Sequence, residues 1–337
     1  MEIDIFSFRC NIFIGNLHEE RSVMNDIGML LLQAVLLVLG FVMLVKGADW
    51  FVEGVAGIAE KFGIPQLVIG LTIVAMGTSA PEAAVSITSA LKGNAGITIG
   101  NVVGSNIMNV LVILGLTAVI TNLAVQQSTI RYELPFMLVI SIILLVMGMG
   151  DNTITFIEGI VLWVLFILYL TYLFIMAKKK KEEPEEEKVR PMWQLLLFGI
   201  IGAALVVWGA DITVDSASNI AKFFGMSDRL IGLTIVAFGT SLPELVTSVT
   251  AAKKGKADIA IGNIVGSNVF NILFVVGTTA LVTPVAFESK FIIDSLVAFG
   301  AGVLLWLGVF KNKELRRSAG ALMLLAYCGY FVYLLLG

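Results

Sequence analysis

Long apolar runs, separated by short polar segments, make up most of the chain. Because a bilayer core about 30 Å thick requires roughly 20 apolar residues per helix, each run of about this length predicts one membrane-spanning helix. Ten such runs predict spans at residues 29–51, 66–91, 96–121, 133–150, 154–177, 192–213, 229–252, 258–282, 290–310 and 317–336. The pattern predicts an all-α integral membrane protein with ten transmembrane helices.

A dense run of charge separates the first five spans from the last five. Residues 178–190 read KKKKEEPEEEKVR, with one proline and no apolar face. Such a segment is typical of a solvated linker, and the alternative is a regulatory loop that binds cations. We predict an N-terminal extension without the features of a signal peptide at 1–28, a five-helix repeat at 29–177, a charged linker at 178–191 and a second five-helix repeat at 192–337.

The two halves repeat one sequence. IGLTIVAMGTSAPE from Ile69 aligns with IGLTIVAFGTSLPE from Ile231, with 12 of 14 positions identical. GNVVGSNIMN from Gly100 aligns with GNIVGSNVFN from Gly262, and both pairs are 162 residues apart. Since each repeat contains an odd number of spans, the second repeat enters the membrane from the opposite side. Inverted repeats of this kind are typical of secondary transporters, which bind their substrate near the midplane.

The distribution of Lys and Arg predicts the orientation. The loops after the odd-numbered spans carry 15 of these residues and the opposite side carries 6. Because cytoplasmic loops are enriched in basic residues, we expect a cytoplasmic linker and two extracellular termini in the plasma membrane of the cell.

Composition agrees with a membrane protein and excludes several other classes. The chain is 58% apolar and 14% charged, with a mean hydropathy of +0.95, whereas about a quarter of an average soluble domain is charged. The net charge of −3, without a basic patch, gives no indication of a nucleic-acid partner. Cys10 and Cys328 lie near opposite ends and predict neither a disulfide framework nor a metal site.

Each repeat places a carboxylate inside an apolar span, Glu82 in GTSAPE and Glu244 in GTSLPE. A charge at the centre of a span costs about 2.5–3.5 kcal/mol on insertion scales, and neither motif contains Lys or Arg. The motifs do supply oxygen, because Thr78, Glu82 and Ser86 are spaced by four residues and share one helix face.

A proline in each motif adds backbone oxygens. Pro81 has no amide hydrogen, so it leaves the carbonyl of Gly77 without its helical donor and predicts a kink around Ala75–Thr78. Carbonyls freed at this depth need a cavity or a partner, and a bound cation is such a partner. The second motif repeats the arrangement with Thr240, Ser241, Pro243, Glu244 and Ser248.

The neighbouring span in each repeat carries a polar stripe. Its members are Asn101, Ser105 and Asn109 in the first repeat and Asn263, Ser267 and Asn271 in the second. Interhelical hydrogen bonding alone would also explain such a stripe, but a buried glutamate opposite it in both copies favours a shared cation site. Close approach of the paired helices is predicted at Gly100, Gly104, Gly262 and Gly266.

All of these candidate ligands are oxygens. Hard cations take such ligands, and Ca²⁺ accepts about six to eight of them in adaptable geometry. Zn²⁺ and Cu⁺ are disfavoured because histidine and cysteine are missing from the motifs. Two carboxylates balance one divalent or two monovalent cations, which is what an exchanger requires.

GTSAPE with GNVVGSNIMN, and GTSLPE with GNIVGSNVFN, resemble the α-repeats of the cation/Ca²⁺ exchanger superfamily, most closely the prokaryotic sodium/calcium exchangers, over about 300 residues. The resemblance implies ten helices in two inverted halves around a central ion cluster. It implies metal ligation by Ala75, Thr78, Ser79, Glu82, Ser105, Asn109, Ala237, Thr240, Ser241, Glu244, Ser267 and Asn271, with Ala75 and Ala237 acting through their carbonyls.

The resemblance also carries expectations about mechanism. The first and sixth spans, at 29–51 and 192–213, would slide across the rest to alternate access. Asparagine at Asn271, where potassium-dependent relatives have an acidic residue, indicates exchange without potassium. A duplicated acidic set outside the motifs comprises Asp49, Glu53, Asp211 and Asp215, and we interpret it as solvated helix ends, with a rim that attracts cations as the alternative.

The leading functional hypothesis is an antiporter that exchanges Na⁺ for Ca²⁺ in the lipid bilayer, as a monomer and without a cofactor. A Ca²⁺/H⁺ antiporter is the alternative, because burial can keep a glutamate protonated. A channel or cation sensor is a third reading. No nucleophile–base pair, phosphate loop or cofactor motif suggests an enzyme.

Overall fold

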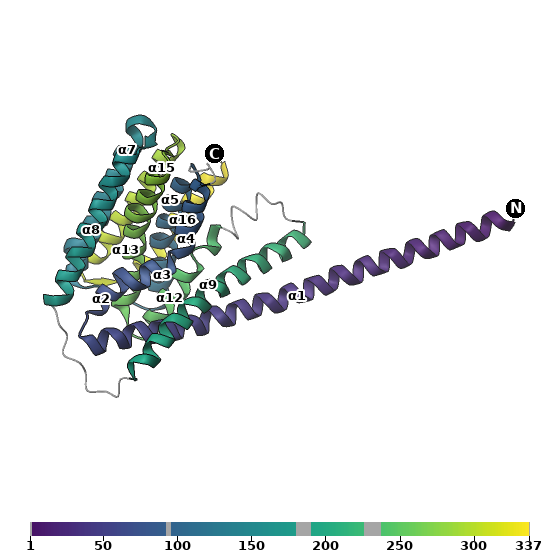
Figure 1. The fold of residues 1–337 in the computed structure, drawn as a ribbon, viewed down its shortest axis with the longest axis horizontal. Coiled ribbons are helices and arrows are strands. Elements are labelled where there is room, and N and C mark those ends of the chain that lie inside the picture. Colours follow the sequence, from purple (N-terminus) through teal and green to yellow (C-terminus); the bar gives the residue numbers. More distant parts are fainter. Residues whose placement is uncertain (1, 92–95, 180–189, 226–236, 337) are drawn as a thin grey trace.

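The protein is a bundle of long helices, as the apolar pattern predicts (Figure 1). The computed structural model describes residues 2–91, 96–179, 190–225 and 237–336. Strand structure in these ranges is limited to four strands of two residues each. The all-helical prediction is therefore confirmed for the described residues.

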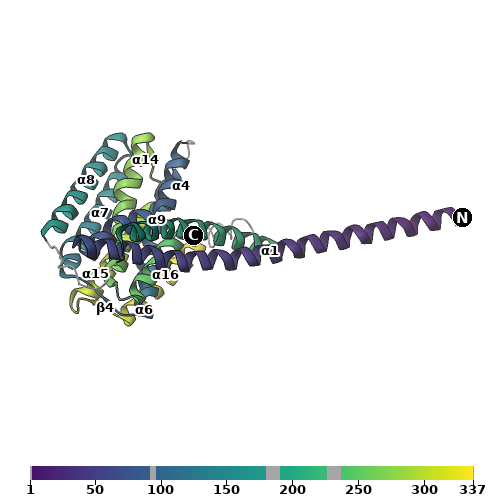
Figure 2. The same cartoon turned by 60° about the horizontal axis from the view of Figure 1, so that its bottom comes forward.

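Helix α1 (Glu2–Phe62) is longer than the predicted span at 29–51. Its N-terminal part projects from the bundle, and its C-terminal part packs along α9 (Met192–Phe223), as Figures 1 and 2 both show. The helix ends where Gly63 takes a φ of 64°, which glycine tolerates without steric cost, and Pro65 follows closely.

The second and third spans of the first half are interrupted helices. Their elements are α2 (Gln66–Ile69), the π-helical η1 (Gly70–Val74), α3 (Ala75–Thr78), α4 (Ala80–Leu91), α5 (Gly96–Met108), the π-helical η2 (Asn109–Leu114) and α6 (Gly115–Ile120). The segment ending at Thr78 and the helix beginning at Ala80 are bent by 49°. The predicted kink is present, and it falls at Ser79, directly after the predicted stretch.

The remaining elements complete both halves. The first half continues with β1 (Leu123–Ala124), the π-helical η3 (Thr129–Glu133), α7 (Leu134–Asp151), β2 (Thr153–Ile154) and α8 (Phe156–Lys179). The second half contributes α11 (Ala237–Gly239), α12 (Leu242–Lys253), α13 (Ala257–Phe270), the π-helical η5 (Asn271–Val276), α14 (Gly277–Val282), β3 (Val285–Ala286), α15 (Lys290–Phe310), β4 (Glu314–Leu315) and α16 (Arg317–Leu336). The π-helical segments η2 and η5 begin at repeat-equivalent asparagines.

Two short antiparallel ribbons join the halves. Strand β1 pairs with β4, with Leu123 opposite Leu315, and β2 pairs with β3, with Thr153 opposite Ala286. In each ribbon, a loop of the first half meets a loop of the second half. The two ribbons are equivalent under the internal repeat, because β1 of the first half corresponds to β3 of the second, and β2 corresponds to β4.

Eight of the described helices are long and apolar enough to cross a bilayer, and the bent pair Gln66–Thr78 and Ala80–Leu91 brings the number to nine. The predicted span at 229–252 lies partly outside the described residues, which resume at Ala237. Most outward-facing side chains of α7, α8 and residues 28–62 of α1 are apolar, as lipid contact requires. The chain is a multi-pass helical membrane protein.

The segment Ala257–Val282 runs through the centre of the bundle and is almost entirely buried. Close approach there depends on glycine, as predicted. A Cβ atom added to Gly262 would lie 3.0 Å from the Cα of Gly70, and one added to Gly266 would lie 2.7 Å from the carbonyl oxygen of Leu71. The prediction is wrong for Gly104, because no described atom lies within 4 Å of a Cβ added there. Helix α13 therefore packs directly on the backbone of η1.

Candidate cation site

The two duplicated motifs face each other across the centre of the bundle. Glu82 in α4 and Glu244 in α12 are both buried, with 1% and 0% of their surface exposed. The hydroxyl of Ser79, from the first motif, donates a 2.8 Å hydrogen bond to Oε1 of Glu244 in the second. Thr78 donates across the same boundary to Oδ1 of Asn263 at 2.9 Å. The structure therefore brings residues of the two motifs into contact.

The bend at Ser79 makes these contacts possible. Ser79 has φ −84° and ψ 8°, outside the helical geometry of its neighbours. The break changes the direction of the chain between Thr78 and Glu82. As a result, side chains of one motif reach the partner helices of the other repeat.

Asn101 in the first half and Asn263 in the second half make equivalent hydrogen bonds. Asn101 donates from Nδ2 to the carbonyl of Glu82 at 3.1 Å and to Oγ of Ser86 at 2.8 Å. Asn263 makes the equivalent bonds to the carbonyl of Glu244 at 3.4 Å and to Oγ of Ser248 at 2.9 Å. These bonds hold each glutamate-bearing helix against its polar neighbour. Interhelical bonding thus accounts for this part of the stripe.

A second pair of asparagines, which the sequence reasoning missed, links the halves. Asn106 and Asn268 each donate from Nδ2 to the backbone carbonyl of the other at 3.3 Å. Their Oδ1 atoms accept hydrogen bonds from Asn271 at 3.2 Å and Asn109 at 3.0 Å, respectively. The four asparagines form a reciprocal cluster at the boundary between the repeats. The identical Gly-Ser-Asn in both stretches was the signal in the sequence.

Several buried oxygens around the motifs have no hydrogen-bond partner among the described residues. They are Oε2 of Glu82, Oε2 of Glu244, Oδ1 of Asn109, Oδ1 of Asn271 and Oγ of Ser241. The first four are two repeat-equivalent pairs. Leaving such groups unsatisfied is costly, about 1–3 kcal/mol each and more for charged groups.

No fixed positive charge among the described residues compensates the two carboxylates. In the described part of the chain, no Lys or Arg side chain pairs with Glu82 or Glu244. Nor does that part contain a cluster of three or more His, Cys, Asp and Glu side chains that could hold a metal ion. Any cation held here would have two carboxylates and otherwise neutral oxygens as ligands, which suits Ca²⁺ or Na⁺.

The structure also describes the remaining predicted ligands, except for the side chain of Ala237. Ser105 and Ser267 are buried, and Ser267 donates to the carbonyl of Ala75 at 3.4 Å. Thr240 is half-buried beside the second motif. Ala237 begins α11, and its side chain lies outside the described part.

The duplicated acidic residues outside the motifs differ between the halves. Asp211 and Asp215 line a cavity of about 320 Å³ that reaches Pro81 and Thr240. In contrast, Asp49 is paired with Lys254 at 3.2 Å and Glu53 with Arg190 at 2.8 Å. The interpretation as purely solvated helix ends is therefore incomplete, because one set borders a cavity next to the site and the other forms ion pairs.

The described fold and site define a class, a multi-pass membrane protein with an oxygen-lined, carboxylate-bearing centre. Comparison with known proteins assigns the family. The sequence profile described as "Sodium/calcium exchanger protein" matches residues 32–175 and 194–336. The chain belongs to the sodium/calcium exchanger family, and its activity is cation/Ca²⁺ antiport.

Relatives cover nearly the whole chain. Sodium/calcium exchanger MaX1 of Methanosarcina acetivorans is 30% identical over 347 residues, covering 91% of this chain and 99% of its own length. Inner membrane protein YrbG of Escherichia coli is 34% identical over 311 residues, covering 87% and 94%. A structure of the sodium-calcium exchanger NCX_Mj superposes with a TM-score of 0.80 at 34% identity, covering 90% and 99%.

Proposed function

We propose that the protein exchanges Na⁺ for Ca²⁺ by alternating access around the paired glutamates. The observation that carries this proposal is the set of buried oxygens without hydrogen-bond partners, which both repeats contribute. A site with two negative charges is nearly neutral when it holds one Ca²⁺ or two Na⁺. It is unfavourable in hydrocarbon when it holds neither, which suppresses movement without cargo.

We also propose ten spans in two inverted repeats, at 29–177 and 192–337, joined by the linker at 178–191. The reciprocal Asn106–Asn268 bonds support a pseudo-twofold axis between the halves. The ribbons support it as well, because each pairs loops that lie on the same side of the membrane if the spans alternate. On this topology the linker is cytoplasmic and both termini are extracellular, in the plasma membrane.

The ion ligands in this proposal are the twelve predicted residues. Glu82 and Glu244 supply charge, the hydroxyls and amides of Thr, Ser and Asn supply neutral oxygens, and Ala75 and Ala237 supply carbonyls. Two formal charges favour exchange that does not require potassium. A single chain contains both motifs, so we propose that a monomer is sufficient.

The two duplicated pairs of acidic residues support an arrangement in which the cation site opens to the extracellular side. On the proposed topology the cavity beside Asp211 and Asp215 opens toward the extracellular side, where it would guide cations to Thr240. The ion pairs of Asp49 and Glu53 lie toward the cytoplasmic side. If α1 and α9 slid across the bundle, Asp49 and Glu53 would border an open cavity while Asp211 and Asp215 would be closed off. The site would then open to the cytoplasm.

The test is radioactive Ca²⁺ uptake into proteoliposomes loaded with Na⁺, K⁺ or acid. We expect uptake only with internal Na⁺, and its loss in Glu82→Gln and in Glu244→Gln, because each change removes a buried ligand charge. Glu288→Gln, at an exposed loop carboxylate, is the control. Uptake that persists in both site variants would contradict the proposal. Uptake driven by acid instead of Na⁺ would identify the Ca²⁺/H⁺ antiporter.

A further inference from the structure

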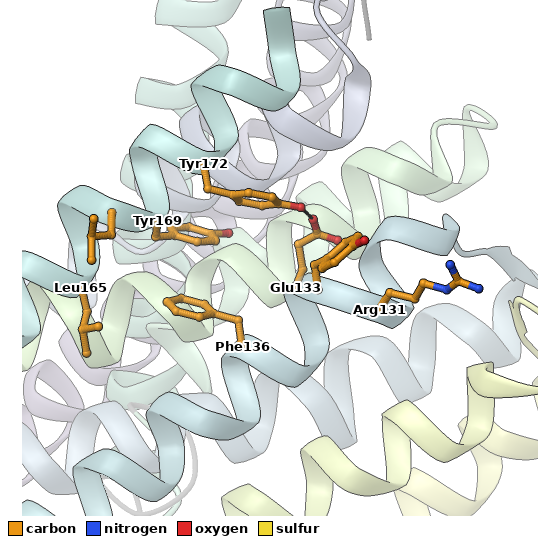
Figure 3. A pocket seen from close by; sticks show the side chains of 8 residues that line it. Arg131, Glu133, Phe136, Leu165, Tyr169 and Tyr172 are labelled. Carbon is orange, nitrogen blue, oxygen red and sulfur yellow. Dashed lines mark hydrogen bonds between the residues drawn. The ribbon is translucent and has the colours of Figure 1, made fainter. Parts of the chain in front are cut away.

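A second cavity, of about 340 Å³, lies between η3, α7 and α8 (Figure 3). None of its lining residues belongs to the duplicated motifs. The lining consists of Arg131, Tyr132, Glu133, Phe136, Leu165, Leu168, Tyr169 and Tyr172. The transport mechanism proposed above does not use this cavity.

One end of the cavity is polar. Glu133 is 1% exposed, and the hydroxyl of Tyr172 donates a short hydrogen bond to its Oε1. Tyr169 is 5% exposed, and its hydroxyl has no hydrogen-bond partner among the described residues. Arg131 lines the same cavity, and Figure 3 shows its guanidinium pointing away from Glu133. The cavity therefore offers a buried carboxylate and a separate cation.

The other end of the cavity is apolar, and the lining residues change from polar to apolar from the helix ends toward the helix centres. Glu133 lies in the first turns of the segment Thr129–Asp151, and Tyr172 lies near the end of α8, which finishes in two lysines. Further into each helix, Phe136 stacks on Tyr169 with ring centroids 5.3 Å apart, and Leu165 follows. Tyrosine and lysine are typical of the bilayer interface, so the polar end lies at headgroup depth and the apolar end at acyl-chain depth.

We propose that this cavity binds an aminophospholipid, with phosphatidylethanolamine as the chemical type. Its primary ammonium would donate to Glu133 beside the rings of Tyr169 and Tyr172, because a carboxylate accepts more than one hydrogen bond and aromatic faces attract cations. The phosphate would meet Arg131 and accept a bond from the Tyr169 hydroxyl. The first part of an acyl chain would lie along Phe136 and Leu165.

The charges select among lipids. A choline headgroup has no N–H to donate to Glu133, and a glycerol headgroup would leave the buried carboxylate beside a net negative lipid. The site also belongs to one repeat only, since Ile293 and Ser295 occupy the positions equivalent to Arg131 and Glu133. The second half contains a different carboxylate–tyrosine pair, in which Tyr330 donates to Asp294 at 2.9 Å. That pair provides a matched control.

The test is native mass spectrometry of the delipidated full-length protein titrated separately with phosphatidylethanolamine, phosphatidylcholine and phosphatidylglycerol. We expect the protein to retain one phosphatidylethanolamine molecule with about tenfold preference over each of the other two lipids. This ratio corresponds to the free energy of about one charge-assisted hydrogen bond. Glu133→Gln should abolish this preference, and Tyr169→Phe, which keeps the ring, should weaken binding severalfold. Asp294→Asn should leave both unchanged.

Equal retention of the three lipids, or an undiminished preference in Glu133→Gln and Tyr169→Phe, would overturn the proposal. Stronger retention of phosphatidylglycerol would do so too, since it would indicate a site governed by Arg131 alone. Failure of Glu133→Gln to fold leaves Tyr169→Phe as the deciding variant. Because Glu82→Gln should keep the lipid preference, the outcome is independent of the transport proposal.

Discussion

At the scale of single residues, the asparagine cluster decides where the site oxygens point. Asn271 donates its Nδ2 to Asn106, and its Oδ1 has no hydrogen-bond partner among the described residues. Asn109 is held in the same way by Asn268. An amide has one donor end and one acceptor end, so fixing the donor end directs the oxygen elsewhere. Asn106 and Asn268 are therefore positioning residues for the candidate ligands.

Replacing Asn106 tests this arrangement. Asn106→Ala removes the donor to the Asn268 carbonyl and the acceptor for Asn271, so we expect a loss of about 1–3 kcal/mol in stability and roughly a tenfold weaker apparent affinity for Ca²⁺. Asn268→Ala should behave alike, because its bonds are equivalent. Thermal unfolding and Ca²⁺-dependent uptake measure the two effects. Thr117→Val is the control, since that hydroxyl donates to the Ile113 carbonyl one turn earlier and takes no part in the asparagine cluster.

At the scale of helices, α1 and α9 pack closely against each other through glycines. Cβ atoms built on these glycines would lie 3 Å or less from atoms of the opposite helix, and the glycines are Gly40, Gly47, Gly54, Gly202 and Gly209. Along each helix they recur every seven residues. This glycine seam brings the two backbones close together, and side chains add to the contact, since Thr213 lies next to Gly40 and Trp50 stacks on Phe198. In the proposed sliding, a side chain at any of these glycine positions would collide with the opposite helix.

Alanine at one of these positions should impede the proposed sliding of α1 and α9. A Cβ at Gly202 would lie 2.4 Å from the backbone nitrogen of Phe51, whereas one at Gly199, on the same helix, meets no described atom within 4 Å. We therefore expect Gly202→Ala to slow Na⁺-driven Ca²⁺ uptake at least severalfold and Gly199→Ala to leave it near the original rate. Equal rates in the two variants would argue against a tightly packed sliding seam.

The helices also show how far sequence reasoning extends. Apolar length predicted helices long enough to cross a bilayer, of which the described residues contain eight or, with the bent pair, nine. Repetition predicted that Glu82 and Glu244 belong to facing motifs. The π-helical segments were not predicted, because the same residues suit an α-helix and only tertiary packing selects the wider turn. The length of α1 was underestimated, since its polar residues continue the helix beyond the apolar run. Asn106 was missed because it lies off the four-residue stripe of Asn101, Ser105 and Asn109.

At the scale of the whole molecule, inverted topology predicts opposite exposure of equivalent residues. Ala124 in β1 and Ala286 in β3 are repeat-equivalent and both are exposed. In a variant with Cys10 and Cys328 replaced by serine, we expect a cysteine at position 124 to react with an impermeant maleimide that is applied to the cytoplasmic face, as inside-out vesicles allow. A cysteine at position 286 should react from the outside. Labelling of both from one side would refute the inverted arrangement.

The contacts between the halves predict that the linker is dispensable for assembly. Buried bonds from Ser79 to Glu244 and between Asn106 and Asn268, together with two ribbons, hold the halves together, and none of these contacts involves residues 180–189. Residues 1–179 and 190–337, co-expressed as separate chains, should therefore copurify through a tag on one half and restore Na⁺-driven Ca²⁺ uptake. Either half alone should give no uptake, because each provides one glutamate of the pair. Copurification without uptake would mean that the linker acts in transport itself, which a purely solvated connector does not do.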